Sequence, residues 1–319
     1  MKSATCREYE TGLTMIELMI ALSLGLFVIL SATGLLLSGK AAYLAQDQNA
    51  QVQETGPYAI EMLSRAIRQA GYENRDGDGT PIRRTADFSP DIMGMDARSL
   101  KRTGPALAEA APSATVNGSD VMALRFFGDG EVIVNCAGLI VPAAASQQHA
   151  DEARGWSIFY VARDSGGEPE LRCKYRSQKG WSADAIARGV ESFQVLYGVD
   201  VDGDGLADRF VNASDIDALD DAMPLTGENA LARAADKNRR TYWKRIRSIR
   251  VSLLMRSEQA ARGDVPREVH YLFGSAYDRI DDKGTRIDEA NLSPAVQKRI
   301  RKVFTQTILL RNDIGGSAP

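Results

Sequence analysis

Residues 13–37 form an unbroken apolar run, LTMIELMIALSLGLFVILSATGLLL, in which Glu17 is the single charged side chain. A helix rises about 1.5 Å per residue, so a run of this length crosses a hydrocarbon layer of about 30 Å. Lys2 and Arg7 precede the run and favour a cytoplasmic N-terminus, which places the rest of the chain outside. The run therefore predicts one transmembrane helix over residues 13–37.

A cleaved secretory signal is the alternative interpretation of this run. Such signals have a shorter apolar region that is followed by a cleavage site of small residues. The stretch Ser31-Ala32-Thr33-Gly34 imitates such a site, but more apolar residues follow it. The length of the run favours a membrane anchor.

The residues around the start of the run, TGLTMIEL from Thr11 to Leu18, resemble the class III signal of type IV prepilins. That signal has a polar leader ending in Gly, an apolar residue, Thr, two apolar residues, Glu and a long apolar helix. The resemblance implies that a prepilin peptidase cuts between Gly12 and Leu13 and then methylates the new amino group of Leu13. Leu13 itself departs from the family pattern, in which Phe is usual at this position.

The resemblance also gives Glu17 a role, because it is the fifth residue of the mature chain. In the family this Glu pairs with the N-terminal amine of a neighbouring subunit during assembly. A carboxylate inside an apolar helix costs several kcal/mol unless it is paired or lies near the interface. The alternative is an interfacial Glu that tolerates its position.

Helical patterning continues beyond the apolar run as far as residue 70. Gly56-Pro57 interrupts the pattern, and we expect Pro57 to kink or restart the helix. Gly71 is the expected C-cap. We therefore expect a leader over residues 1–12, a stem helix over 13–70 and a periplasmic or extracellular head over 71–319.

The head is predicted to consist mostly of antiparallel strands. Residues 76–112 are rich in Gly, Pro, Asp and Arg and predict a long loop. The runs that follow alternate apolar and polar residues, as strands with one buried face do: 120–127, 131–134, 156–161, 171–175, 190–197, 246–254 and 268–273. A long helix followed by such strands predicts an α+β fold, with the helix packed on the sheet.

Three further segments resemble the PilW type of minor pilin, namely residues 65–72, 246–256 and 301–312. This resemblance implies a subunit of the type IV pilus that primes assembly near the tip. It implies other minor and major pilins, the prepilin peptidase, an inner-membrane assembly platform and a tip adhesin as partners. It also implies roles in cell adhesion and twitching motility, and a location first in the inner membrane and then in the fibre. The alternatives are a minor pseudopilin of a type II secretion system, or a membrane-anchored binding module or enzyme.

The chain has three cysteines, Cys6, Cys136 and Cys173. Removal of residues 1–12 leaves two, and each of these lies in or beside a strand-like run. In an oxidising compartment they favour one disulfide, with two buried free thiols as the alternative.

The segment that follows residues 190–197 matches the first nine positions of an EF-hand loop, D-x-D-x-D-G-x-x-D. Oxygen ligands at alternating positions can wrap one hard cation, and Gly205 permits the sharp turn. The predicted calcium ligands are Asp200, Asp202, Asp204, the carbonyl of Leu206 and Asp208. Position twelve is Val211 rather than Glu, and Asp215 or Asp217 would have to replace that ligand. A plain Asp/Gly turn is the alternative, and residues 74–79 repeat the pattern in a shorter form.

No catalytic residues are predicted. The two histidines, His149 and His270, are interpreted as structural or solvated, and no nucleophile or zinc motif is present in the sequence. The net charge of −3 argues against nucleic acid as the main partner. The basic stretch from Lys244 to Arg250 alternates with apolar residues and is interpreted as the solvated face of a strand.

Overall fold

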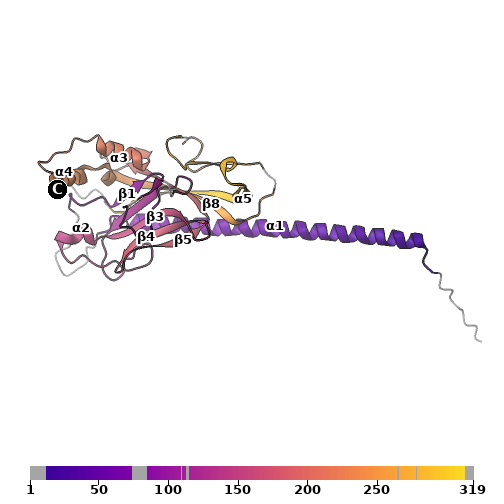
Figure 1. Ribbon diagram of the computed structural model, residues 1–319. Helices are drawn as coiled ribbons and strands as arrows, with labels where there is room; N and C mark the ends of the chain where they lie inside the picture. Colours follow the sequence, from indigo (N-terminus) through magenta and orange to yellow (C-terminus); the bar gives the residue numbers. More distant parts are fainter. Residues whose placement is uncertain are drawn as a thin grey trace, which may run out of the picture. The chain divides into compact units, whose positions relative to one another are not determined.

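The computed structural model in Figure 1 describes residues 12–73, 85–108, 110–112, 115–263, 266–277 and 279–312. The chain forms two compact units, one that ends at Asp47 and one that begins at Gln48. A single helix, α1 (Met15–Gln69), contributes to both. The structure confirms the predicted α+β order, because this long apolar helix precedes antiparallel sheets.

The first part of α1 carries the apolar run. Its side chains are exposed, with Met15 at 81% and Phe27 at 70%. Among the described residues, α1 is the helix long and apolar enough to cross a membrane, as judged by its length and composition. The exposed fractions fit a segment whose side chains contact lipid or neighbouring helices.

The predicted interruption at Gly56-Pro57 is wrong, because α1 runs through Pro57 without a break. Burial of Val52, Ala59 and Leu63 holds this part of the helix against the head and offsets the hydrogen bond that Pro57 cannot donate. The predicted end is confirmed: the helix stops at Gln69, and Gly71 follows with φ of 68°.

A five-stranded antiparallel sheet forms one layer of the head. Its strands follow chain order: β1 (Ile92–Met95), β2 (Val121–Phe126), β3 (Gly155–Arg163), β4 (Pro169–Ser177) and β5 (Gly180–Arg188). Every neighbouring pair is antiparallel. Short turns join β3, β4 and β5, so the three strands form a meander.

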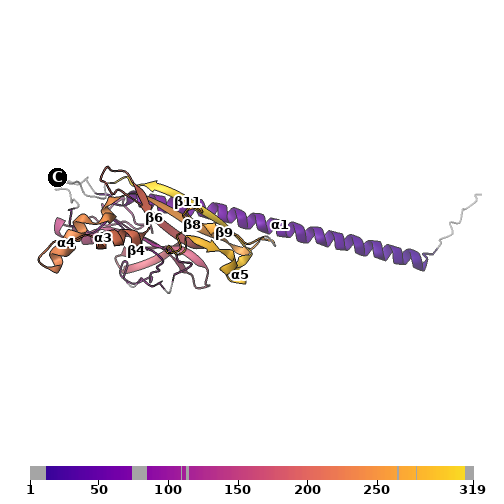
Figure 2. The ribbon, with the colours of Figure 1, turned by 90° about the horizontal axis from the view of Figure 1, so that it is seen from above.

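A four-stranded sheet forms the second layer, with the order β11-β8-β6-β7. Its strands are β6 (Val190–Val199), β7 (Arg209–Val211), β8 (Ile246–Ala260) and β11 (Arg299–Leu309). Figure 2 shows β11, β8 and β6 as adjacent strands. The second part of α1 packs on β11, where Ser64 Oγ donates to Gln306 Oε1 at 3.0 Å and Lys302 Nζ donates to Gln53 Oε1 at 2.8 Å.

Shorter elements surround the two sheets. The helices are α2 (Ala150–Ala153), α3 (Ala213–Asp221), α4 (Ala230–Arg240) and α5 (Pro294–Gln297), and a two-stranded sheet joins β9 (Val269–Tyr271) to β10 (Arg286–Asp288). The chain after β9 lies against β8 and β11. The hydroxyls of Ser252 on β8 and Thr305 on β11 both donate to the carbonyl of Leu272. One core joins α1 to both sheets and includes Leu63, Leu124 and Val251.

One strand prediction and part of one loop prediction are wrong. Residues 131–134 form no strand, because the Asp129 carboxylate accepts the backbone N–H groups of residues 131, 132 and 133 and so competes with ladder pairing. Only an isolated bridge between Val134 and Ile140 remains there. The predicted loop over 76–112 contains β1 in its described part, while residues 76–84 lie outside the described residues.

Candidate functional site

The processing motif lies at the start of α1. Gly12, Leu13 and Thr14 are not helical, and the helix begins at Met15. Thr14 N and Thr14 Oγ1 both donate to Glu17 Oε2 at 2.9 Å, and Glu17 N donates to Thr14 Oγ1 at 3.4 Å. This reciprocal pattern is a capping box, which satisfies backbone donors that a helix start leaves unpaired. The Gly12–Leu13 bond therefore lies just outside the helix, and the rest of the predicted leader lies outside the described residues.

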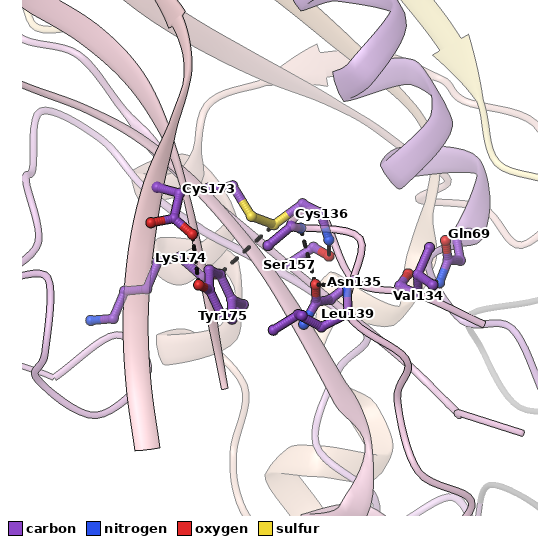
Figure 3. The surroundings of a disulfide bond; sticks show 11 residues. Gln69, Val134, Asn135, Cys136, Leu139, Ser157, Cys173, Lys174 and Tyr175 are labelled. Atoms are coloured by element: carbon purple, nitrogen blue, oxygen red, sulfur yellow. Dashed lines mark hydrogen bonds between the residues drawn. A yellow bond between two sulfur atoms is a disulfide. The ribbon is translucent and has the colours of Figure 1, made fainter. Parts of the chain in front are cut away.

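The two cysteines of the head form a disulfide, in agreement with the pairing that the sequence favours. Cys136 and Cys173 are joined with a Cα–Cα distance of 5.9 Å, and Figure 3 shows their surroundings. Cys136 lies in the loop between β2 and β3, and Cys173 lies in β4. The disulfide thus ties this loop to the five-stranded sheet.

Other contacts hold the same loop to its neighbours. Cys136 N donates to Ser157 Oγ at 2.9 Å, and Gln69 Nε2 donates to the carbonyl of Val134 at 2.9 Å (Figure 3). The end of α1 is therefore linked to β3 and β4 through residues 134–136.

The acidic loop lies between β6 and β7, where the sequence places it. One carboxylate oxygen from each of Asp200, Asp202 and Asp208 lies within 4.8 Å of the others. Asp204 is outside this group and accepts the N–H of Leu206 at 2.8 Å. Three of the predicted carboxylates therefore converge on one point.

Two features of this loop differ from the predicted calcium geometry. Asp200 Oδ2 already pairs with Arg247 Nη2 at 3.1 Å and accepts the N–H of Gly205 at 2.9 Å. Neither expected substitute for position twelve reaches the loop. Asp215 pairs with Arg279, and Asp217 accepts from Trp243 Nε1 at 3.0 Å.

A buried ion network, which the sequence does not indicate, crosses three strands of the four-stranded sheet. Glu191 on β6 pairs with Arg256 on β8 at 3.0 Å and with Arg301 on β11 at 2.6 Å. Their side chains are 2%, 5% and 0% exposed. Buried charges of this kind are costly unless they are paired and hydrogen-bonded, as they are here.

Glu168 extends the network to the turn between β3 and β4. Its carboxylate pairs with Arg299 at 2.6 Å and with Arg256 at 2.7 Å. The hydrogen bond from Arg299 lowers the pKa of Glu168 to about 2, with a further contribution from Arg256, and together they outweigh burial. The only signal in the sequence is the alternation of arginines in β11, and their partners lie more than a hundred residues away.

The histidines and the basic stretch have local partners. His270 Nε2 lies 3.0 Å from Glu289 Oε1, and His149 Nδ1 lies 3.2 Å from Ser146 Oγ. Arg247 pairs with Asp200, and the Arg250 guanidinium lies 4.0 Å from the centroid of the Phe210 ring. The stretch is therefore less solvated than predicted, because these side chains pack against their own sheet.

A groove of about 450 Å³ lies between α1, β5 and β8. Its apolar lining includes Val52, Ile186 and Met255, and its charged lining includes Arg188 and Glu258. No histidine, serine or cysteine is among its lining residues in the described part of the chain.

Residues 158–312, just under half of the chain, match the family model described as Type IV Pilus-assembly protein W (PilW). Together with the apolar N-terminal helix, this match supports a pilin-type role and fits membrane anchoring. The resemblance to PilW proteins is thus confirmed over the second half of the chain, which includes the segments 246–256 and 301–312.

Among solved structures, the chain is similar to the type IV-like pilin TTHA1219 from Thermus thermophilus. The identity is 13%, the alignment covers 84% of this chain and 97% of that chain, and the TM-score is 0.31. A likeness at this level adds no argument about function. No curated protein matches the chain.

Proposed function

We propose that the protein is a minor pilin, a structural subunit that helps to prime assembly of a type IV pilus and has no enzymatic activity. The observation that carries this proposal is the TGLTMIEL motif at the start of a 55-residue helix. The PilW match over residues 158–312 supports it from an independent part of the chain. The proposed partners are other minor and major pilins, the inner-membrane platform and a tip adhesin.

Processing is proposed at the bond between Gly12 and Leu13, followed by N-methylation of Leu13. The test is the N-terminal mass of the protein from membranes of cells with and without prepilin peptidase. We expect a chain that begins at N-methylated Leu13 only where the peptidase is present. A chain that begins at Met1 in both cells would contradict the proposal and favour a simple anchored module.

Glu17 is proposed to act after processing, as the partner of a neighbouring subunit's N-terminal amine. In the isolated chain its carboxylate is held by Thr14, so it would exchange an internal partner for a charged one. We expect Glu17→Ala to be cleaved normally but to be lost from sheared fibres. Thr14→Ala is the matched control, because it removes the Thr14 hydroxyl and leaves the Glu17 carboxylate and the backbone N–H of residue 14 in place.

The finer assignment to a pilus rather than a type II secretion system rests on the PilW match alone. After deletion of the gene we expect loss of surface fibres, adhesion and twitching motility, with protein secretion unchanged. Loss of secretion with intact fibres would favour the pseudopilin alternative. The head is proposed to face the periplasm and then the cell surface.

We propose calcium as the ligand of the acidic loop, supported by the convergence of Asp200, Asp202 and Asp208. Calcium is a hard cation that prefers such oxygen ligands. The test is the thermal unfolding of the full chain with and without added calcium. We expect Asp202→Asn to abolish any calcium-dependent stabilisation and Asp204→Asn, outside the converging group, to weaken it less. If the unsubstituted chain unfolded at the same temperature with and without calcium, the acidic loop would be interpreted as a plain Asp/Gly turn.

A further inference from the structure

Asp120 joins the two sheets of the head. Its backbone N–H donates to the carbonyl of Phe193 on β6 at 2.8 Å. Its carboxylate accepts the N–H of Val195, also on β6, at 2.9 Å and the N–H of Ala97, just after β1, at 3.1 Å. Asp120 directly precedes β2, so these bonds form a seam between β2 and β6.

The seam brings two carboxylates together. Met95 is paired with Val121 at the end of the β1–β2 ladder, so Asp96 directly follows β1 next to the point where Asp120 precedes β2. Two negative charges in such neighbouring positions repel each other. Asp96 is held in place, because it accepts the N–H groups of Ala213 and Ser214 at the start of α3, at 3.0 and 2.7 Å.

Among the described residues, the side chains whose charges act most strongly on Asp120 are carboxylates. From the turn before β10, Asp282 adds a third carboxylate, which is 4% exposed and accepts a hydrogen bond from Tyr277 Oη at 2.7 Å. From β6, the Tyr197 hydroxyl is buried without a hydrogen-bond partner among the described residues. From α3, the charge of Asp217 contributes to raising the pKa of Tyr197. Arg279, between β9 and β10, acts to lower the pKa of Asp282 and also pairs with Asp215 and Asp281.

Asp120 is 2% exposed, so it has little access to water that would stabilise a negative charge. Burial is the largest cause that raises the pKa of Asp120 well above its usual range, and the charges of Asp96 and Asp282 add to it. The backbone N–H groups of Val195 and Ala97 act in the opposite direction and do not outweigh these causes. A protonated carboxyl still accepts both of those hydrogen bonds, because it keeps acceptor lone pairs.

We propose that Asp120, buried beside Asp96 and Asp282, keeps its proton in the folded chain above the ordinary pH range of an Asp, and that the hydrogen-bonded seam between β2 and β6 weakens as the pH rises. The folded chain then binds a proton that the unfolded chain releases above the ordinary range of an Asp. Stability consequently decreases with rising pH, with a slope of up to about tenfold in the unfolding equilibrium constant per pH unit. This device is independent of the proposed role in a pilus.

The experiment measures denaturant unfolding of the full chain in detergent between about pH 5.5 and 8.5. Tryptophan fluorescence reports the head selectively, because Trp156, Trp181 and Trp243 all lie in it. In this pH range, the acidic residues whose pKa is lowered by folding are ionised in both the folded and the unfolded chain. The difference between wild type and Asp120→Asn isolates Asp120 from the two histidines, which both proteins share.

We expect the unfolding constant of wild type to rise with pH and Asp120→Asn to lose most of that rise. Asp184→Asn on β5 is the matched control, because Asp184 is 54% exposed, and it should keep the wild-type slope. Equal slopes for Asp120→Asn and wild type would overturn the proposal.

Asp96→Asn keeps the experiment decisive if Asp120→Asn does not fold. This substitution retains a side-chain oxygen for the N-terminus of α3 but removes the charge opposite Asp120. We expect the pH-dependent rise to move to lower pH, and infrared difference spectra of wild type to contain a protonated carboxyl band at the acidic end of this pH range. An unchanged profile together with the absence of that band would overturn the proposal.

Discussion

Gly56 of α1 lies directly against the ring of Phe304 of β11, and a Cβ atom at this position would overlap that ring. Glycine inside a helix ordinarily costs about 1 kcal/mol relative to alanine. Here the close approach of helix and strand offsets that cost. The contact explains why a residue that weakens a helix is present in the middle of α1.

Gly56→Ala should therefore destabilise the head, by about 1–3 kcal/mol, because the added methyl group must displace Phe304. The measurement is the denaturant midpoint followed by tryptophan fluorescence. Gly39→Ala is the matched control, since Gly39 is in the same helix and a Cβ there meets nothing within 4 Å. If both variants gave the same midpoint as wild type, the Gly56–Phe304 contact would not limit packing.

Removal of the disulfide with Cys136→Ser and Cys173→Ser should lower the free energy of unfolding by about 2–4 kcal/mol. The reason is that the disulfide closes a loop with a sequence separation of 37 residues. Unfolding of wild type with and without a reductant measures the same quantity. The reductant should leave the double variant unchanged. A reductant effect on that variant would point to a different target.

Acid should weaken the link between Glu168 and its arginines. The pKa of Glu168 is lowered to about 2 in the folded chain. Its contribution is therefore complete above the ordinary pKa of a Glu and is lost as the pH falls from about 4.5 towards 2. We expect Glu168→Gln to lower stability at pH 6 and to lose less stability than wild type on acidification to about pH 3.

The exposed residue Glu228 provides the comparison for this prediction. Glu228→Gln should follow the wild-type profile at every pH. Identical acid profiles for Glu168→Gln and wild type would mean that Glu168 makes no ionic contribution to the fold.

Arg301→Leu should cost about 3–5 kcal/mol, because it leaves the buried carboxylate of Glu191 without one of its two arginine partners. The measurement is again denaturant unfolding of the head. Arg311, just after the end of the same strand, is exposed, and Arg311→Leu should change stability by less than about 0.5 kcal/mol. Equal effects of the two substitutions would contradict the importance of the buried pair.

The elements predicted correctly have a strong local pattern. Alternation located β3, β6 and β8, and the length of the apolar run located the start of α1. The strand β5 was not predicted from the sequence. Its residues, GWSADAIAR, are mostly small or polar, because this strand lies at the edge of its sheet. The β11 strand was assigned only as a family segment, because its arginines mask the alternation.

The same distinction applies to the candidate sites: the sequence indicates those formed by neighbouring residues and not those formed by distant ones. The acidic loop and the prepilin motif are contiguous in sequence. The spacing of its aspartates indicates the first, and the resemblance to prepilin signals indicates the second. The network around Glu191 joins residues 65 and 110 positions apart, and no local pattern indicates such pairs. The proximity of Asp96 to Asp120 follows from the register of β1 and β2, which only the folded sheet defines.

The unbroken course of α1 from Met15 to Gln69 has a consequence for proteolysis. Proteases cut exposed, irregular backbone, and α1 offers none where one compact unit ends at Asp47 and the next begins at Gln48. Separation of the two units by proteolysis would thus require local unwinding before cleavage. The head should remain attached through protease treatments that sever ordinary interdomain linkers.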